Sequence, residues 1–399
     1  MRVSNDTLRS AFLSALEAAN RRLIDTQEKV SSGKRVNKPS DDPVAAARIA
    51  HLDASLSRLD QYKSNSDFAR NQLGLEESSL TSVLDNLQRI RELALQANNS
   101  TTSDSDRKDI AAEVSQARDA LLALANTTDV DGRHLFGGYV EGPTPFTKTS
   151  SGAVVYNGDQ GQRTLQISDS RFVAINDSGS DVFQKVPQGN GTFTLAVNPA
   201  NTGTGVIGDS GVATPAAWVR DTYRINFLTP TTYEVRDSAN AVVSSGTFTP
   251  GGQSIAFRGV DIRIDGNPAS GDSFTAAPAG NRDVFGMMDD LMTALGSSTG
   301  TDAERAKLNS NIGQRIADLD NALSHVINVR GEIGARVRAL DQQDSLSADF
   351  ALHLNTTLSS VRDLDYADAL SRLQKEMFGL DAAQQTFART QDLSLFKYI

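Results

Sequence analysis

The sequence predicts a multidomain α+β protein in which long, coiled-coil-like helices from both chain ends flank an inserted all-β domain. Near both termini, apolar side chains recur at alternating steps of three and four, which is the spacing of a coiled-coil seam. Between about residues 138 and 280, short runs are separated by Gly, Pro, Asn and Asp, which is typical of strands and turns.

These changes in pattern divide the chain into three parts. We expect residues 1–35 and 360–399 to form terminal assembly helices, and residues 36–137 and 281–359 to form a helical bundle. Residues 138–280 would be the inserted β-rich domain. Because the insert leaves and re-enters one helical body, its two junctions should lie close together.

The composition limits the possible function classes. The net charge of −10 disfavours nucleic-acid and anionic-membrane partners, because both attract basic proteins. The absence of cysteine excludes disulfides, thiolate catalysis and cysteine-bound zinc. No secretory signal or membrane span of ~20 apolar residues is evident. Composition alone therefore indicates a cytoplasmic protein, although it does not detect export without a cleavable signal.

The first helix is predicted over about residues 6–30. One face carries a continuous row of apolar and small side chains: Phe12, Leu16, Ala19, Leu23, Thr26 and Val30. Such a row needs a second helix to cover it. The simplest partner is the similar row at the other end of the chain, if the two ends meet.

A link of turn-forming residues follows, over residues 31–43. Gly33 is expected to end the first helix, and Pro39 prevents a helix from continuing immediately before it. Ser40 or Asp41 would cap the next helix, with Pro43 in its first turn.

Two adjacent carboxylates in this link, Asp41 and Asp42, are candidate metal ligands. Carboxylates at the start of a helix more often cap it and complement its dipole. We therefore interpret both as structural residues and predict no metal site here.

Two further helices should pack antiparallel. A heptad register supports a second helix over about residues 43–98, which would span roughly 80 Å. A polar turn separates it from a third helix that begins near Ser105. The third helix should therefore fold back on the second.

The β-rich insert is expected to be a sandwich or a barrel-like unit. The predicted strands cover residues 154–156, 164–167, 192–197, 222–228, 232–235, 242–249, 254–257, 260–264 and 273–276.

The final helical run extends over about residues 302–396 and would exceed 100 Å if unbroken, at ~1.5 Å per residue. Its register slips near Asp365 and resumes with Tyr366, Leu370, Leu373, Met377, Leu380 and Phe387. Glycines in the run predict one or more bends. The alternative is an ordinary amphipathic helix on a globular core, but that does not need such length.

No pattern of residues indicates catalysis. The four histidines are isolated, and no HExxH pair, GxSxG elbow or phosphate-binding glycine loop is present. We therefore predict no catalytic residue, no cofactor and no metal. A carboxylate pair hidden in the β insert is the enzymatic alternative.

The link between the first two helices resembles that of the flagellin superfamily. The matching residues are Ser32, Gly33, Asn37, Pro39, Asp41, Asp42 and Pro43. The opening Met-Arg-Val-Ser, residues 132–138 and the ending Leu-Ser-Leu-Phe-Lys-Tyr-Ile are similar to the junction-protein branch rather than to flagellin. Residues 186–193, 259–262 and 266–274 of the insert are also similar to that branch.

The resemblance implies a structural protein of the bacterial flagellum, exported through the flagellar type III system. It would lie extracellularly at the hook–filament junction, between hook-associated protein 1 and the flagellin filament. It would associate with further copies of itself in a helical ring or tube. The resemblance also implies an export chaperone on the C-terminal helix.

The terminal rows of apolar residues suggest how such a protein assembles. The predicted assembly interface comprises Phe12, Leu16, Leu23, Val30, Tyr366, Leu370, Leu373, Met377, Leu380 and Phe387. We expect these segments to be disordered in the monomer and helical after assembly. Two alternatives are the filament flagellin itself, and a helical adhesin or enzyme with an active site in the β domain.

Overall fold

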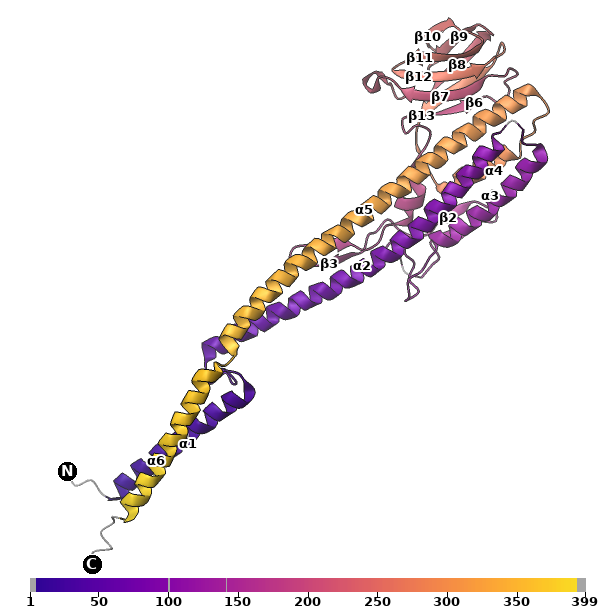
Figure 1. The fold of residues 1–399 in the computed structure, drawn as a ribbon. Coiled ribbons are helices and arrows are strands. Elements are labelled where there is room, and N and C mark those ends of the chain that lie inside the picture. The colour runs from indigo at the N-terminus through magenta and orange to yellow at the C-terminus, as the bar shows by residue number, and fades with distance from the viewer. Residues whose placement is uncertain (1–4, 100, 141, 393–399) are drawn as a thin grey trace, which may run out of the picture. The chain divides into compact units, whose positions relative to one another are not determined.

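The computed structural model describes residues 5–99, 101–140 and 142–392 (Figure 1). The chain forms two compact units. We call residues 1–64 with 342–399 the terminal unit, and the residues between them the central unit. The described part of the chain contains no helix with the length and apolar character needed to cross a membrane.

The terminal unit is built around two helices, α1 (Asn5–Ser32) and α6 (Tyr366–Asp392), which lie side by side (Figure 1). The rings of Phe12 and Phe387 are 6.1 Å apart, and Gly33 at the other end of α1 lies beside Tyr366. The two helices are therefore antiparallel. The predicted pairing of the two chain ends is confirmed.

Two long helices, α2 (Pro43–Ala97) and α5 (Asp302–Arg362), contribute to both units. The predicted slip near Asp365 is the break between α5 and α6. Gly313 and Gly331 lie inside α5, so they do not end the helix.

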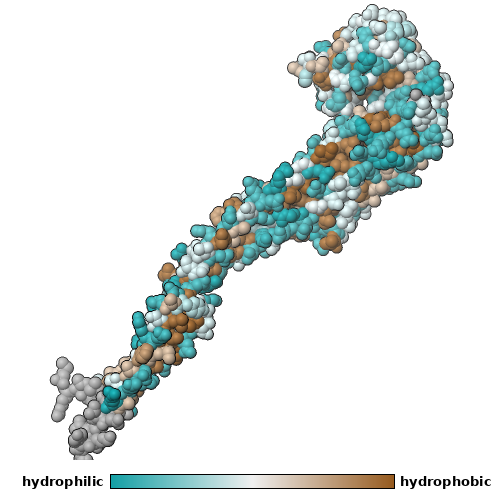
Figure 2. Space-filling model, in the orientation of Figure 1, coloured by the Kyte–Doolittle hydropathy of each residue, from teal (hydrophilic) through white to brown (hydrophobic). Residues whose placement is uncertain are grey.

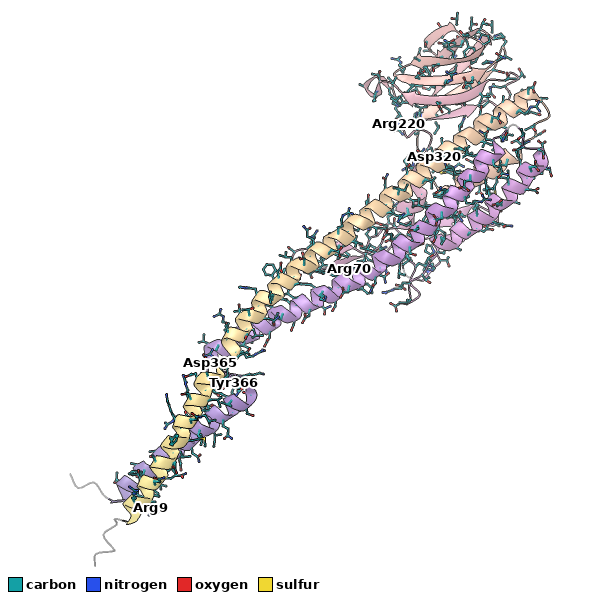
Figure 3. All side chains as sticks on the ribbon, viewed as in Figure 1. Arg9, Arg70, Arg220, Asp320, Asp365 and Tyr366 are labelled. Carbon is teal, nitrogen blue, oxygen red and sulfur yellow. The ribbon has the colours of Figure 1, made fainter. Side chains whose placement is uncertain are left out.

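In the central unit, α2 packs antiparallel against both α3 (Asp104–Ala125) and α5. Arg89 of α2 donates to Glu113 of α3 at 2.6 Å. Ser79, earlier on α2, donates to the backbone carbonyl of Leu124, later on α3. Along α5, Arg70 pairs with Asp341 and Arg91 with Asp320; Arg70 and Asp320 are labelled in Figure 3. Residue numbers thus rise on α2 as they fall on both neighbours, which confirms the predicted antiparallel pair.

One core holds these helices together with α4 (Val284–Leu295). It is formed by large apolar residues that α2 and α5 direct toward each other at helical spacing. Fully buried members include Leu73, Leu80, Leu87, Val114, Leu121, Leu291, Leu319, Val326 and Ile333.

The β-rich part of the central unit contains a two-sheet sandwich. One sheet has the order β10-β9-β8-β13-β6, and the other has the order β11-β12-β7. The strands are β6 (Phe193–Val197), β7 (Val206–Val212), β8 (Tyr223–Thr229), β9 (Thr232–Arg236), β10 (Val242–Thr247), β11 (Gly251–Phe257), β12 (Val260–Gly266) and β13 (Ser273–Pro278). Phe227 and Ile262, from different sheets, share one apolar core, as expected for a sandwich.

Two hairpins pack against the helices instead of joining the sandwich. They are β1 (Phe146–Lys148) with β2 (Val154–Tyr156), and β3 (Thr164–Gln166) with β4 (Phe172–Ala174). Phe146 and Val173 belong to the helical core. The segment predicted as one insert therefore packs in two different ways, and the predicted domain boundaries stay a prediction.

A short neck joins the helical core to the sandwich. Strand β5 (Val186–Pro187) pairs antiparallel with β14 (Asn281–Arg282). Close to it, Phe136 and Phe285 both contact Phe183, which lies in the π-helical turn Ser180–Gln184. The segments that precede and follow the sandwich therefore meet at residues 186–187 and 281–282. The sequence did not predict β1, β4, β5, β7 or β14, which are short or interrupted by glycine.

Candidate assembly interface and helix clasp

The predicted interface residues of α1 form one side of the helix pair. Phe12, Leu16, Leu23 and Val30 are all partly buried. On α6, three residues at steps of seven, Leu373, Leu380 and Phe387, are also partly buried. Since steps of seven share one helix face, these residues form the side of α6 that meets α1.

The other predicted residues of α6 are about half exposed, although the Tyr366 hydroxyl also lies beside Gly33 at the end of α1. Tyr366, Leu370 and Met377 are 51%, 47% and 56% exposed, and Phe378, which the sequence pattern did not single out, is 77% exposed. Figure 2 shows hydrophobic surface on the helix pair. The residues predicted as one row on α6 are therefore divided between two surfaces. One surface is covered by α1, and the other is exposed. We call the exposed surface the open face of α6.

The contact between α1 and α6 is thin. Of the residues in these two helices whose side chains the structure describes, only Ala369 is fully buried. Glu376 lies within the contact, and its enclosed Oε2 has no hydrogen-bond partner. Because helix pairs gain most of their stability from buried apolar residues, this pair is marginal by itself.

The link motif is fastened to the break between α5 and α6 by backbone hydrogen bonds. Leu364 N–H donates to the carbonyl of Gly33 at 3.0 Å, and Arg35 N–H donates to the carbonyl of Arg362 at 2.7 Å. Nε and Nη2 of Arg35 donate to the carbonyl of Val361 at 3.2 and 2.8 Å. We call this set of bonds the helix clasp.

The clasp satisfies backbone groups that the helix ends leave unpaired. The guanidinium of Arg35 donates to the carbonyl of Val361 in the last turn of α5, where a positive charge also complements the helix dipole. Asp365 immediately precedes α6, and its carboxylate accepts from the N–H of Ala367 in the first turn at 2.9 Å; Asp365 and Tyr366 are labelled in Figure 3. Arg35 and Leu364 were not predicted from the sequence, because their contacts join residues more than 300 positions apart.

The remaining motif residues hold the link in shape. Ser32 Oγ donates to Asn37 Oδ1 at 2.8 Å. Asp41 Oδ2 accepts from the N–H groups of Asn37 and Lys38 at 3.0 and 2.9 Å. These backbone bonds, led by that from Lys38, lower the pKa of Asp41 below its ordinary value. Pro39 is exposed in the turn between Lys38 and α2.

The cap of α2 is Asp42, so the prediction of Ser40 or Asp41 was wrong. Asp42 Oδ1 accepts from the N–H of Ala45 at 3.0 Å, which is N-cap geometry with Pro43 as the first helical residue. Asp41 is unable to cap because its carboxylate bonds the preceding turn.

Gly33 is the most constrained residue of the clasp. Its φ of +70° is left-handed, and an added Cβ would lie 2.7 Å from the Tyr366 hydroxyl. We expect Gly33→Ala to destabilise the helix pair by about 1–3 kcal/mol. Circular dichroism under assembly conditions should show a lower helix content than that of the wild-type protein.

A matched control is Gly379→Ala, inside α6, where an added Cβ meets nothing within 4 Å. This change should stabilise the helix by about 1 kcal/mol and raise the helix content. Equal behaviour of the two variants would show that the clasp has no part in ordering the helix pair.

The histidines serve structural roles where the structure gives them partners. His134 Nδ1 and His325 Nε2 each donate to a backbone carbonyl, at 2.9 and 2.7 Å. Within residues 5–99, 101–140 and 142–392, no group of three or more His, Cys, Asp or Glu side chains could hold a metal.

Known proteins resemble this chain along most of its length. The family described as the bacterial flagellin N-terminal helical region matches residues 3–141. Flagellar hook-associated protein 3 of Salmonella typhimurium is 26% identical over 398 residues, covering 100% of this chain and 99% of that protein.

Two crystal structures are similar in sequence and fold. FlgL of Xanthomonas campestris is 39% identical with a TM-score of 0.69, covering 77% of this chain and 99% of that chain. The flagellar junction protein FlgL of Legionella pneumophila is 30% identical with a TM-score of 0.73, covering 79% and 100%. These matches favour the junction protein over the alternatives of flagellin and enzyme. The chain belongs to the family of flagellar hook-associated protein 3, or FlgL, and is a structural component of the flagellar hook–filament junction, not an enzyme.

Proposed function

We propose that this protein builds the junction by burying the open face of α6, together with α1, against neighbouring subunits. The observation that carries the proposal is the row of exposed Tyr366, Leu370 and Met377 on a helix pair that is itself thin. Burying one large apolar side chain contributes about 1.5–3 kcal/mol. About a dozen such contacts per subunit, together with the hydrogen bonds of the helices, would offset the cost of ordering them.

The family associates with hook and filament proteins, and we propose specific partners within that group. Copies of the chain associate in a helical ring or tube. Hook-associated protein 1 binds on one side of this ring and flagellin on the other. The match of residues 3–141 to the flagellin N-terminal helical region supports contact with flagellin, because similar helices can continue one packing arrangement.

The division of labour follows the predicted domains. Residues 1–35 and 360–399 act as assembly helices, the bundle over 36–137 and 281–359 supports them, and the insert over 138–280 takes no part in terminal packing. In the free monomer the terminal helices are largely disordered, and they become helical on assembly. An export chaperone covers the C-terminal helix until then.

Immunogold labelling of intact flagella tests the location. An antibody against the sandwich should label a narrow band at the distal end of the hook. Label along the whole filament would contradict the proposal. Circular dichroism tests the ordering step separately, because helix content should rise when monomers assemble, and an unchanged spectrum would refute that step.

A further inference from the structure

Three charged residues from three different segments meet inside the central unit. Glu76 of α2 is 1% exposed, and Asp177, which follows β4, is 4% exposed. Arg336 of α5 donates to both carboxylate oxygens of Asp177, at 2.9 and 2.7 Å. The N–H of Asp177 donates to Glu76 Oε1 at 3.0 Å. The cluster therefore ties the loop after β4 to both long helices.

The charges of this cluster do not balance if Glu76 is ionised. The carboxylate of Asp177 accepts hydrogen bonds from Nη1 and Nη2 of Arg336 and from the side chain of Gln162, the last at 2.7 Å. Glu76 Oε2 is enclosed without a hydrogen-bond partner. A buried anion without its own counter-charge is costly, so the geometry favours the neutral acid.

The other groups around Glu76 do not remove this imbalance. Arg336 and, to a smaller extent, Arg163, from the segment before β3, attract the ionised form, but each attracts it less than Asp177 repels it. Glu332, one turn before Arg336 on α5, lies 3.6 Å from that guanidinium and adds a further negative charge.

We propose that Glu76 is a proton-controlled latch, which as a neutral acid holds the segment 162–178 between α2 and α5 and releases it in alkaline solution. Neutral Glu76 accepts the N–H of Asp177 without repelling its carboxylate. Ionised Glu76 places two carboxylates side by side against one shared guanidinium, which weakens the hold of the helices on this segment.

The direction of titration agrees with this geometry. Burial, followed by the negative charge of Asp177, raises the pKa of Glu76 from 4.5 to about 8. Between these two values the folded protein holds a proton that the unfolded chain has lost. Stability from this site is therefore complete below pH 4.5 and is lost as the pH rises through about 8. The unfolding constant rises by up to tenfold per pH unit in that window.

The test uses the full chain and its Glu76→Gln variant. The carboxyl carbon of Glu76, followed by NMR, should titrate near pH 8. In urea unfolding, the wild-type unfolding constant should rise at least tenfold from pH 6 to pH 8 relative to that of Glu76→Gln. Glu77→Gln, at the neighbouring, partly buried position that pairs with Arg330 and not with Asp177, should keep the wild-type pH dependence.

Two results would overturn the latch. One is a Glu76 titration at its ordinary value of 4.5, which needs no variant to be folded. The other is an identical pH dependence in wild type and Glu76→Gln. If Glu76→Gln does not fold, Asp177→Asn provides a second measurement. It removes the adjacent negative charge and should lower the midpoint of Glu76, so an unchanged midpoint would also contradict the proposal.

Discussion

A chain with Leu370→Asp and Met377→Asp is expected to remain folded as a monomer and to form no junction. Both side chains lie on the open face of α6 and are about half exposed, so the monomer loses no buried contact. In the assembly, each change removes about 1.5–3 kcal/mol of apolar burial and places an unpaired carboxylate in the interface. Electron microscopy and motility of cells that carry this variant should show hooks without filaments.

A control pair places the same charges on another face of α6. Ser371→Asp and Thr386→Asp are at exposed polar positions, and neither lies three or four residues from Leu370 or Met377, so they are not on that face. This pair should assemble, because it adds two carboxylates without removing apolar surface. Normal filaments with Leu370→Asp and Met377→Asp would exclude the open face from the interface. Loss of assembly in both pairs would indicate that charge alone is responsible.

Phe183→Ala is expected to destabilise the central unit by about 3–5 kcal/mol, the usual cost of removing a buried phenylalanine. The Phe183 side chain is fully buried. Its ring centroid lies 5.2 Å from that of Phe136, 5.4 Å from Phe146 and 6.2 Å from Phe285. Truncation leaves a cavity between the segments that lead into and out of the sandwich. Urea unfolding followed by circular dichroism should show a lower midpoint.

The single tryptophan allows the sandwich to be followed separately. Trp218 packs against Phe193 and Tyr223 in the sandwich core, so its fluorescence reports that core. Its transition should shift less than the helical transition in Phe183→Ala. Phe378→Ala, at an exposed position of α6, serves as the control and should leave both transitions in place. Equal shifts of both signals in Phe183→Ala would contradict separate cores.

The sequence predicted the helices well because their information is local. A heptad row such as that from Phe12 to Val30 specifies both the length of a helix and the face that it buries. The slip in register near Asp365 likewise located the break between α5 and α6. Alternating residues predicted most sandwich strands, whereas β7 was missed because Gly208 and Gly211 interrupt its alternation.

The rest depended on contacts between distant residues. Periodicity identified Tyr366 and Leu373 as members of one row, but it does not state which of them an adjacent helix covers. The bonds from Arg35 to Val361 and from Arg336 to Asp177 leave no pattern in the sequence. Asp42 caps α2 instead of Asp41 because the carboxylate of Asp41 accepts from the N–H of Asn37 in the preceding turn, whereas that of Asp42 accepts from the N–H of Ala45.

The neck between β5 and β14 makes the sandwich an exchangeable module. Pro187 and Asn281 are paired across the neck, so the polypeptide returns to its starting point before the helices continue. A tight turn grafted between these two positions would yield a minimal subunit that retains both chain ends. Changes in size or sequence beyond the neck should therefore leave the helices and both chain ends in place.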